Sequence, residues 1–253
     1  IDHSVVAQGE AAIRARIDQL KAEGVRMAVV DAVSNADLLR LGPALKGMPL
    51  VTAGSGVAIG LPGNFGVAPC NEAARLPAAQ GLQAIVSGSC SVATNQQVMD
   101  FIKAGKPALA IDPLRIAAGV DVAAEALAWA EGHIGQGPVL VYSTAEPSAV
   151  RAIQGKLGSE KAGAMVEETI AAIARGLVQR GVRQLIVAGG ETSGACVQAL
   201  GITQMRIGAQ IDPGVPWCHA VAPDAKDGLH ITLKSGNFGG TDFFTKAFAQ
   251  LQA

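Results

Sequence analysis

The stretch LIVAGGETSGACVQALG places small polar residues directly after an apolar run. The run ends at Gly189 and Gly190, then Glu191, Thr192 and Ser193 follow, and a segment of small residues typical of a helix begins at once. The first backbone amides of a helix have no partner within the helix, and together with the helix dipole they favour an anion. Glycine lets the main chain approach such a ligand without a Cβ in the way. We therefore interpret this turn as one whose amides face a phosphate.

Three further turns have a similar composition. SGSCS follows the apolar run LQAIV, YSTAE follows PVLV, and KSGNFGG follows HITL. In a parallel sheet such turns meet at the carboxyl edge, where α/β proteins bind ligands. One glycine-rich turn is a weak signal, because tight turns need glycine for their own geometry. Four of them on one edge together predict a phosphate site.

Two charged side chains and one aromatic ring near these turns have alternative roles. Lys234 ends a strand directly before SGN, so its ammonium could meet phosphate charge or could simply lie exposed at the strand end. Glu191 could hold Mg²⁺ through water or accept hydrogen bonds from neighbouring amides. Trp217 could stack on a flat ring or anchor its own loop.

Composition and missing motifs exclude several classes of protein. The sequence has no G-x-x-x-x-G-K-[ST] loop, no G-x-G-x-x-G after a strand and no G-x-S-x-G elbow. Its 253 residues carry a formal net charge of −1 and no basic stripe, which argues against a nucleic-acid partner. No run approaches the ~20 apolar residues of a membrane helix. The four cysteines have no metal-ligand spacing and suit a reducing cytoplasm.

Apolar runs typical of strands alternate with helical patterns along the chain. Units of a strand and a polar turn, most of them leading into a helical pattern, are expected within 25–32, 48–61, 82–105, 107–113, 137–148, 183–201 and 229–251. Residues 159–180 predict an amphipathic helix, because Met165, Ile170, Ile173 and Leu177 recur near 3.6-residue spacing. Strands that are apolar throughout indicate a sheet covered on both sides. The predicted fold class is α/β, with a mostly parallel sheet and helices on both faces.

The chain divides by composition into three parts. Residues 62–80 carry prolines and glycines with no firm periodicity, so a linker is predicted over 66–80. Residues 1–65 hold about two βα units, too few for a core, and are interpreted as the end of a preceding domain. Residues 81–253 are the main domain, within which 211–228 is expected to be irregular. Because the chain opens at Ile1 rather than Met, we expect it to be a piece of something longer.

Four segments, taken in order, resemble the signature segments of the four-carbon acid-sugar kinase family. They are VSGSCSVATNQQV, IVAGGETSGACVQALG, IGAQIDPGVPW and LKSGNFGGTDFFTKA, and the resemblance spans about residues 82–251. VDAVSNADL and PLVTAGSGVAIGLP resemble the last βα units of that family's N-terminal sugar-acid-binding domain. The resemblance implies a two-domain, ATP-dependent kinase. It would phosphorylate the terminal hydroxyl of a tetronate such as 3-oxo-tetronate, threonate or erythronate.

The resemblance also implies which residues contact ATP. They are Ser87 or Ser89 in the serine turn, Gly189, Gly190, Glu191 and Thr192 with Ser193 in the second turn, and Gly236 with Asn237 in the last turn. It further implies a four-carbon sugar acid as the second substrate. Phosphoryl transfer from ATP leads us to expect Mg²⁺ as the metal, and a homodimer is kept as one possible assembly. Most of the sugar-acid domain is missing at the front, so the catalytic base is not identified.

Two other functions compete with the kinase. A regulatory domain that binds a nucleotide or another anion without catalysis fits the same turns, and it predicts binding that is indifferent to sugar acids. A nicotinamide-dependent oxidoreductase is disfavoured, because the sequence lacks the dinucleotide fingerprint with an acidic residue about 20 positions further on.

Overall fold

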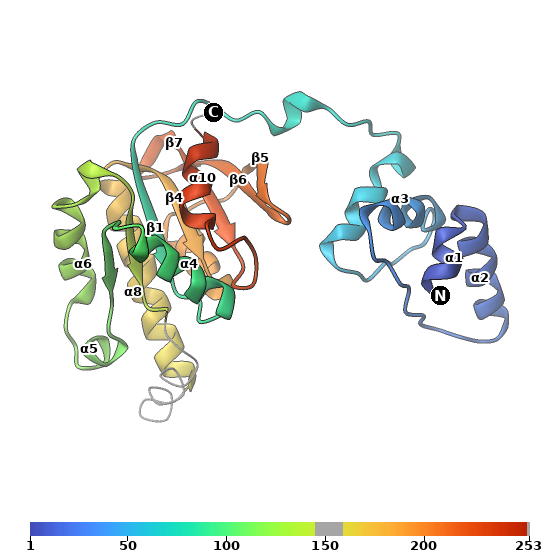
Figure 1. The fold of residues 1–253 in the computed structure, drawn as a ribbon, viewed down its shortest axis with the longest axis horizontal. Helices are drawn as coiled ribbons and strands as arrows, with labels where there is room; N and C mark the ends of the chain where they lie inside the picture. The colour runs from blue at the N-terminus through green and yellow to red at the C-terminus, as the bar shows by residue number, and fades with distance from the viewer. Residues whose placement is uncertain (145–158, 252–253) are drawn as a thin grey trace. The chain divides into compact units, whose positions relative to one another are not determined.

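The computed structural model describes residues 1–144 and 159–251 (Figure 1). It divides into two compact units, Ile1–Asn71 and Glu72–Ala253, and each unit has buried apolar residues of its own. The division falls inside the segment 66–80.

A seven-stranded sheet in the order β2-β3-β1-β4-β7-β6-β5 forms the centre of the second unit. Pairings among β2, β3, β1, β4 and β7 are parallel, whereas β6 pairs antiparallel with both β7 and β5. The predicted mostly parallel sheet is thus confirmed. The strands are β1 (Leu82–Ser87), β2 (Ala108–Ala110), β3 (Val139–Tyr142), β4 (Val182–Ala188), β5 (Arg206–Asp212), β6 (Val215–Ala222) and β7 (Ala225–Lys234).

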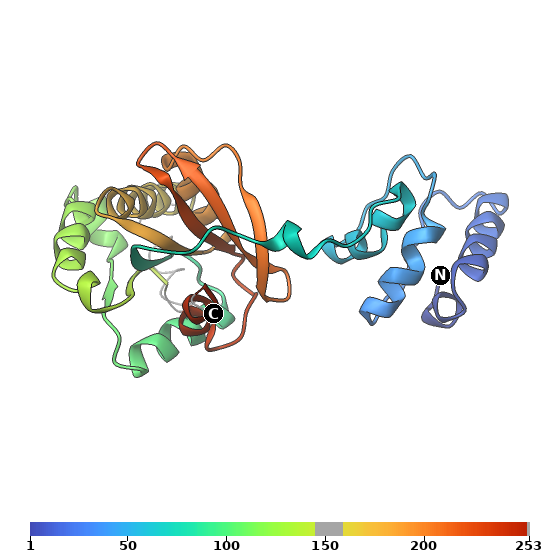
Figure 2. The same cartoon turned by 90° about the horizontal axis from the view of Figure 1, so that it is seen from above.

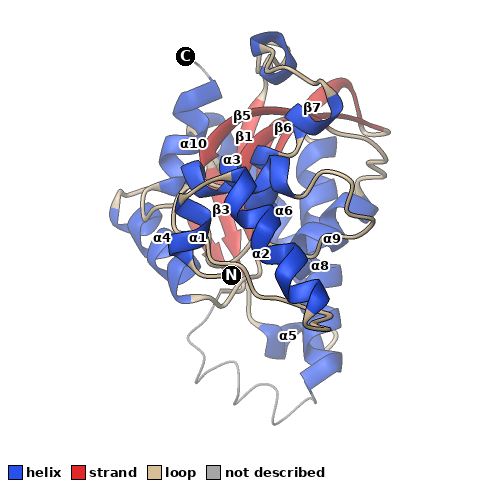
Figure 3. Cartoon of the chain, turned by 90° about the vertical axis from the view of Figure 1, so that its right-hand side faces the viewer, coloured by secondary structure: helices blue, strands red, loops and turns tan. Residues whose placement is uncertain are grey.

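Helices cover both faces of this sheet, as predicted. Helices α6, α8 and α9 lie over one face of the sheet, and α4 and α10 lie over the other (Figures 2 and 3). One apolar cluster packs the first group against the sheet, and a second cluster packs the other group. Successive strand residues alternate between the two clusters, as in β1, where Ala84 and Val86 face one cluster and Ile85 the other. The predicted amphipathic helix is α8, with Ile170, Ile173 and Leu177 buried. The helices are α4 (Val92–Lys103), α5 (Pro113–Ala117), α6 (Val122–Glu131), η4 (Ile134–Gln136), α8 (Ser159–Gln179), α9 (Gly190–Ala199) and α10 (Phe243–Leu251).

The prediction of an irregular segment over 211–228 is wrong. The segment forms the end of β5, all of β6 and the start of β7, joined by two tight turns. Gly214 takes the positive φ of 77° that the first turn requires. Pro216 lies beside a register shift between β5 and β6, where a missing backbone N–H is tolerated. The three prolines of this stretch lie in the two turns and beside one irregular strand pairing. The rest of the stretch is regular β-strand.

The first unit is helical in the structure, and the strands expected within 25–32 and 48–61 are not formed. Among the described residues no strand precedes Leu82. A strand needs a neighbour to accept and donate its backbone hydrogen bonds, and neither segment has one. Met27 stays 92% exposed and Leu50 78% exposed for the same reason. The elements present are α1 (His3–Ala7), α2 (Glu10–Ala22), α3 (Asn35–Ala44), η1 (Ser55–Gly60) and η2 (Pro62–Phe65). The short helix η3 (Asn71–Ala74) falls at the division between the two units.

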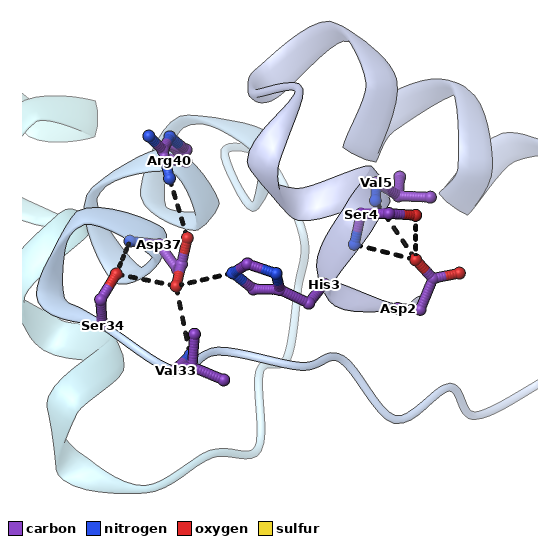
Figure 4. A network of polar contacts seen from close by, with 8 residues as sticks. All are labelled: Asp2, His3, Ser4, Val5, Val33, Ser34, Asp37 and Arg40. Carbon is purple, nitrogen blue, oxygen red and sulfur yellow. Dashed lines mark hydrogen bonds and ion pairs between the residues drawn. The ribbon is translucent and has the colours of Figure 1, made fainter.

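A buried carboxylate holds the start of α3 in the first unit (Figure 4). Asp37 accepts hydrogen bonds from Ser34 Oγ at 2.8 Å and from Val33 N at 3.2 Å. Arg40 Nη1 donates to the same carboxylate at 2.8 Å, and His3 Nε2 lies 3.4 Å away. The hydrogen bond from Ser34, together with these other donors, lowers the pKa of Asp37 to about 2.

Replacing this carboxylate is expected to loosen α3. Asp37→Asn removes the ionised acceptor, so the α3 amides should exchange with solvent faster than in the wild type. The contribution of Asp37 is present above its unfolded pKa of 3.8 and is lost as the pH falls toward about 2. Hydrogen exchange at neutral pH checks this. The control is Asp18→Asn, which replaces a carboxylate at an exposed position on α2. Equal protection of α3 in both variants would contradict it.

Candidate functional site

Three parallel strands end next to one another at the carboxyl edge of the sheet. In the register, Ser87 at the end of β1 pairs with Ala188 of β4, and Ala188 pairs with Lys234 of β7. Backbone hydrogen bonds continue this pairing into the turns, from Gly88 N to Ala188 O at 3.0 Å and from Gly189 N to Lys234 O at 2.8 Å. The SGSCS, GGETSG and KSGNFGG turns therefore lie together. The YSTAE turn begins after β3, and from residue 145 on it lies outside the described residues.

The start of α9 presents free backbone donors at this edge. Within the described residues the amides of Gly190, Glu191 and Thr192 have no acceptor, and no side chain caps the helix. Gly190 and Glu191 are exposed, and a Cβ placed on Gly190 would meet nothing within 4 Å. Gly189, directly before the helix, takes a φ of 130° that other residues rarely adopt. The geometry suits an anion bound at the helix N-terminus.

Lys234 is fully buried, so the predicted alternative of an exposed lysine at the strand end is wrong. Its Nζ donates to Thr94 Oγ1 at 2.9 Å, and to the carbonyl oxygens of Ser235 and Gly236 at 3.2 Å each. All three ammonium protons therefore have acceptors in the protein. Burial lowers the pKa of Lys234 to about 8. The ammonium fixes the turn after β7 by hydrogen bonds, and it places a buried positive charge next to the candidate site.

The last turn packs closely on the serine turn. A Cβ placed on Gly236 would lie 2.6 Å from Ser89 Oγ, so only glycine fits there without a shift. Thr94 Oγ1 and Ser91 Oγ both donate to the carbonyl oxygen of Gly236. These contacts tie the start of α4 to the turn after β7.

The two candidate serines have different surroundings. Ser89 is half-buried beside Gly236, and its Oγ donates to Ser91 Oγ at 3.3 Å. Ser87 is fully buried in β1, and its Oγ lies 2.7 Å from Thr144 Oγ1. The structure therefore brings Ser89 to the turns and leaves the Ser87 hydroxyl in the interior.

The polar side chains at the start of α9 point in different directions. Thr192 is buried and its Oγ1 donates to Glu167 Oε1 at 3.1 Å. Ser193 Oγ donates to the carbonyl oxygen of Gly189 at 2.6 Å. Only Glu191 has an exposed side chain among these three predicted residues. Thr192 is therefore available to a ligand through its backbone amide, while its hydroxyl is already used.

Gln97 on α4 is a residue that sequence reasoning missed. Its Nε2 lies within hydrogen-bond distance of three successive carbonyl oxygens, of Phe238 at 3.0 Å, Gly239 at 3.1 Å and Gly240 at 3.0 Å. The two protons of the amide are shared among these three acceptors. This fixes the loop after Asn237, which is itself exposed, with no side-chain hydrogen bond within the described residues. The only signal in the sequence was the position of Gln97 within the quoted serine segment.

The loop after Asn237 is also held by a residue at the end of β5. Asp212 Oδ2 accepts from Gly240 N at 2.9 Å, and Oδ1 accepts from Lys246 Nζ at 2.7 Å. Trp217 is an anchor, since it is buried and its Nε1 donates to the carbonyl oxygen of Ala247 at 2.8 Å. The IDPG and GNFGG segments, far apart in sequence, are thus held together.

Removing the Gln97 amide should weaken both the fold and the site. Gln97→Ala leaves three carbonyl oxygens without their donor, and we expect a loss of about 2 kcal/mol in the free energy of unfolding. Gln96→Ala, at an exposed position on the same helix, is the matched control and should change little. Urea unfolding of both variants measures this, and equal stabilities would refute the bracing role.

The described residues contain neither a cluster of metal-ligating side chains nor a helix that could span a membrane. Within them no group of three or more His, Cys, Asp or Glu side chains could hold a metal ion. No helix in the described part of the chain is long and apolar enough to cross a membrane.

Comparison with known proteins places these turns in a family. Residues 84–244 match the family model described as a nucleotide-binding C-terminal domain, and residues 1–61 match the model of a sugar-binding N-terminal domain. The chain is 53% identical to a Cupriavidus necator protein named 3-oxo-tetronate kinase, over 98% of the chain. The chain belongs to the four-carbon acid-sugar kinase family. The predicted resemblance is confirmed.

One further curated relative and one solved structure are similar over nearly the whole chain. A Pseudomonas fluorescens protein named 3-oxo-tetronate kinase is 51% identical over 97% of the chain. The chain is 36% identical in sequence to the Haemophilus influenzae protein HI1011, and its structure matches the crystal structure of that protein with a TM-score of 0.73. The match covers 99% of this chain and 60% of the HI1011 chain. The chain spans 57% of the length of the Cupriavidus necator relative and 57% of the length of the Pseudomonas fluorescens relative.

Proposed function

We propose that this chain is chiefly the nucleotide-binding part of an ATP-dependent kinase that phosphorylates a four-carbon sugar acid. The names of its curated relatives favour 3-oxo-tetronate as the acid, with threonate and erythronate as the other candidates. One observation carries the proposal: the free amides of Gly190, Glu191 and Thr192 lie at the carboxyl edge of the sheet, next to two other glycine turns.

In this proposal the backbone supplies most of the binding to ATP. The three α9 amides donate to phosphate oxygens, and the dipole of α9 adds a favourable field. Ser89, Gly236 and Asn237 lie on the two flanking turns and complete the candidate set. Buried Lys234 fixes the turn after β7 and places positive charge below the phosphates. Charge on the transferring group is stabilised by groups that are already in position before reaction.

Mg²⁺ fits this site as a metal held mainly by the nucleotide. Mg²⁺ commonly binds through one or two carboxylates together with phosphates and water, so a protein cage of three or more ligands is not needed. The exposed carboxylate of Glu191, beside the free amides, would hold the ion through water. When bound, the metal neutralises charge on the phosphates.

The reaction itself is proposed to depend on positioning. This chain's residues bind and orient the polyphosphate, and the sugar acid approaches with its terminal hydroxyl in line with the bond to be broken. We place the group that accepts the hydroxyl proton on a part of the sugar-binding domain outside this chain, whose residues 1–61 match one portion of that domain. The chain on its own is therefore expected to bind nucleotide without turnover.

Calorimetry and a kinase assay together test the proposal. ATP and ADP should bind this chain and NAD should not, and the full-length protein should release ADP only when a tetronate is present. Nucleotide binding in a full-length protein that phosphorylates none of the three acids would favour the regulatory alternative. Failure of ATP and ADP to bind would overturn the proposed function.

A further inference from the structure

A carboxylate on α8 lies against the candidate nucleotide turns. Glu167 Oε1 accepts the hydrogen bond from Thr192 Oγ1 at 3.1 Å. A Cβ placed on Gly88, in the serine turn, would lie 3.2 Å from the same oxygen. The second oxygen, Oε2, is buried and has no hydrogen-bond partner among the described residues. Glu167 therefore touches two of the three turns, with one carboxylate oxygen unused.

No cation balances this carboxylate in the described part of the chain. None of the ion pairs formed there includes Glu167. The buried Lys234 donates to other groups. The titratable neighbours are Glu191 and Cys196, both on α9. Burial raises the pKa of Glu167, the Thr192 hydrogen bond opposes this, and the charge of Glu191 adds to the rise.

We propose that Glu167 is a positioning residue that holds the Thr192 hydroxyl through Oε1 and takes up a proton from solvent on Oε2 when nucleotide phosphate binds at the α9 amides. This rests on the proposed nucleotide function. The bond from Thr192 to Glu167 turns the hydroxyl away from the ligand and leaves the Thr192 amide facing it.

The reason for the proton uptake is electrostatic. A polyphosphate at the α9 amides brings several negative charges close to a half-buried carboxylate that has no counter-ion among the described side chains. Like charges disfavour the ionised form, and a proton on the unused oxygen removes the repulsion. The Thr192 hydroxyl still has an acceptor at Oε1, so the turn keeps its geometry.

Calorimetric titration of the 253-residue chain with ADP in EDTA, at about pH 6, tests this directly. The binding enthalpy is measured in buffers of different ionisation enthalpy, and its slope gives the number of protons taken up. The matched variants are Glu167→Gln, which keeps an oxygen acceptor for Thr192 but cannot titrate, and Glu168→Gln, an exposed neighbour on the same helix. Protonation of ADP itself contributes equally to both variants and cancels in the difference.

We expect Glu168→Gln to match the wild type and Glu167→Gln to lose a sizeable fraction of a proton per ADP. Glu167→Gln should also bind ADP about fivefold more tightly at neutral pH, since a negative charge near the phosphates is removed. Its affinity should depend less on pH than that of the wild type. If Glu167→Gln does not fold, the wild type alone must still show proton uptake that grows as the pH falls.

Two results would overturn the inference, and they are distinguishable. ADP binding with equal proton uptake in both variants would remove the role of Glu167 and leave the nucleotide function intact. No binding of ADP at all would overturn the proposed function and this inference together.

Discussion

Gly189→Ala is expected to abolish measurable nucleotide binding and to destabilise the second unit. Gly189 has a φ of 130°, and a Cβ there would lie 2.5 Å from Thr192 Oγ1 and 3.3 Å from Ser89 N. Both the backbone strain and the clash must be relieved by moving the start of α9. We expect a loss of about 3 kcal/mol in unfolding free energy and at least about a hundredfold loss of ADP affinity.

A glycine later in the same helix provides the control for this variant. Gly194 is exposed, and a Cβ there would meet nothing within 4 Å. Gly194→Ala should therefore leave ADP affinity unchanged and stabilise the fold by about 0.5–1 kcal/mol through helix propensity. Urea unfolding and calorimetry measure both quantities. Wild-type ADP affinity in Gly189→Ala would show that the turn geometry does not set binding.

Lys234→Met is expected to weaken ADP binding by about a hundredfold, with little effect on stability. The substitution removes three hydrogen bonds from a charged donor, and the turn that carries Gly236 loses its brace. The free energy of unfolding should change little, because burying an ammonium is itself costly. Lys103→Met, at an exposed position on α4, is the control for loss of one positive charge. Equal ADP affinities in the two variants would contradict the bracing role.

The same lysine gives a pH dependence of known sign. Its pKa is about 8 in the folded protein against 10.5 when unperturbed, so between these values the unfolded state binds more protons. Stability contributed through Lys234 should therefore rise with pH across this window. The test is urea unfolding of the wild type and of Lys234→Met from about pH 7 to pH 10. The difference between their unfolding midpoints should change in favour of the wild type as the pH rises. A difference that is constant across the window would contradict it.

The fold class and the clustering of the turns were predictable from local sequence. Long apolar strands alternating with helices imply a covered parallel sheet, and parallel strands bring their carboxyl ends to one edge. The predictions that were wrong concerned features that depend on which segments are neighbours in space. The segments 25–32 and 48–61 have the composition of strands, but no adjacent strand pairs with them. The prolines in 211–228 suggested a loop, yet they occupy turns and one irregular pairing.

The roles of single site residues were less predictable for the same reason. The environment of Lys234 is set by Thr94, which lies 140 residues earlier in the chain. Glu167 meets Thr192 across two helices, and no motif marks either its position or its unused oxygen. The sequence was enough to place the glycine turn before α9. The burial of the site residues and their hydrogen-bond partners could be read only from the three-dimensional structure.

An NMR titration of backbone amides with ADP, with adenosine as the phosphate-free control, tests the phosphate site most directly. The amides of Gly190, Glu191 and Thr192 should show the largest shifts with ADP, and their titration should give the affinity found by calorimetry. Adenosine should leave them nearly unmoved. If ADP binds and these three amides do not shift, the polyphosphate lies elsewhere, and the proposed phosphate site at the start of α9 is wrong.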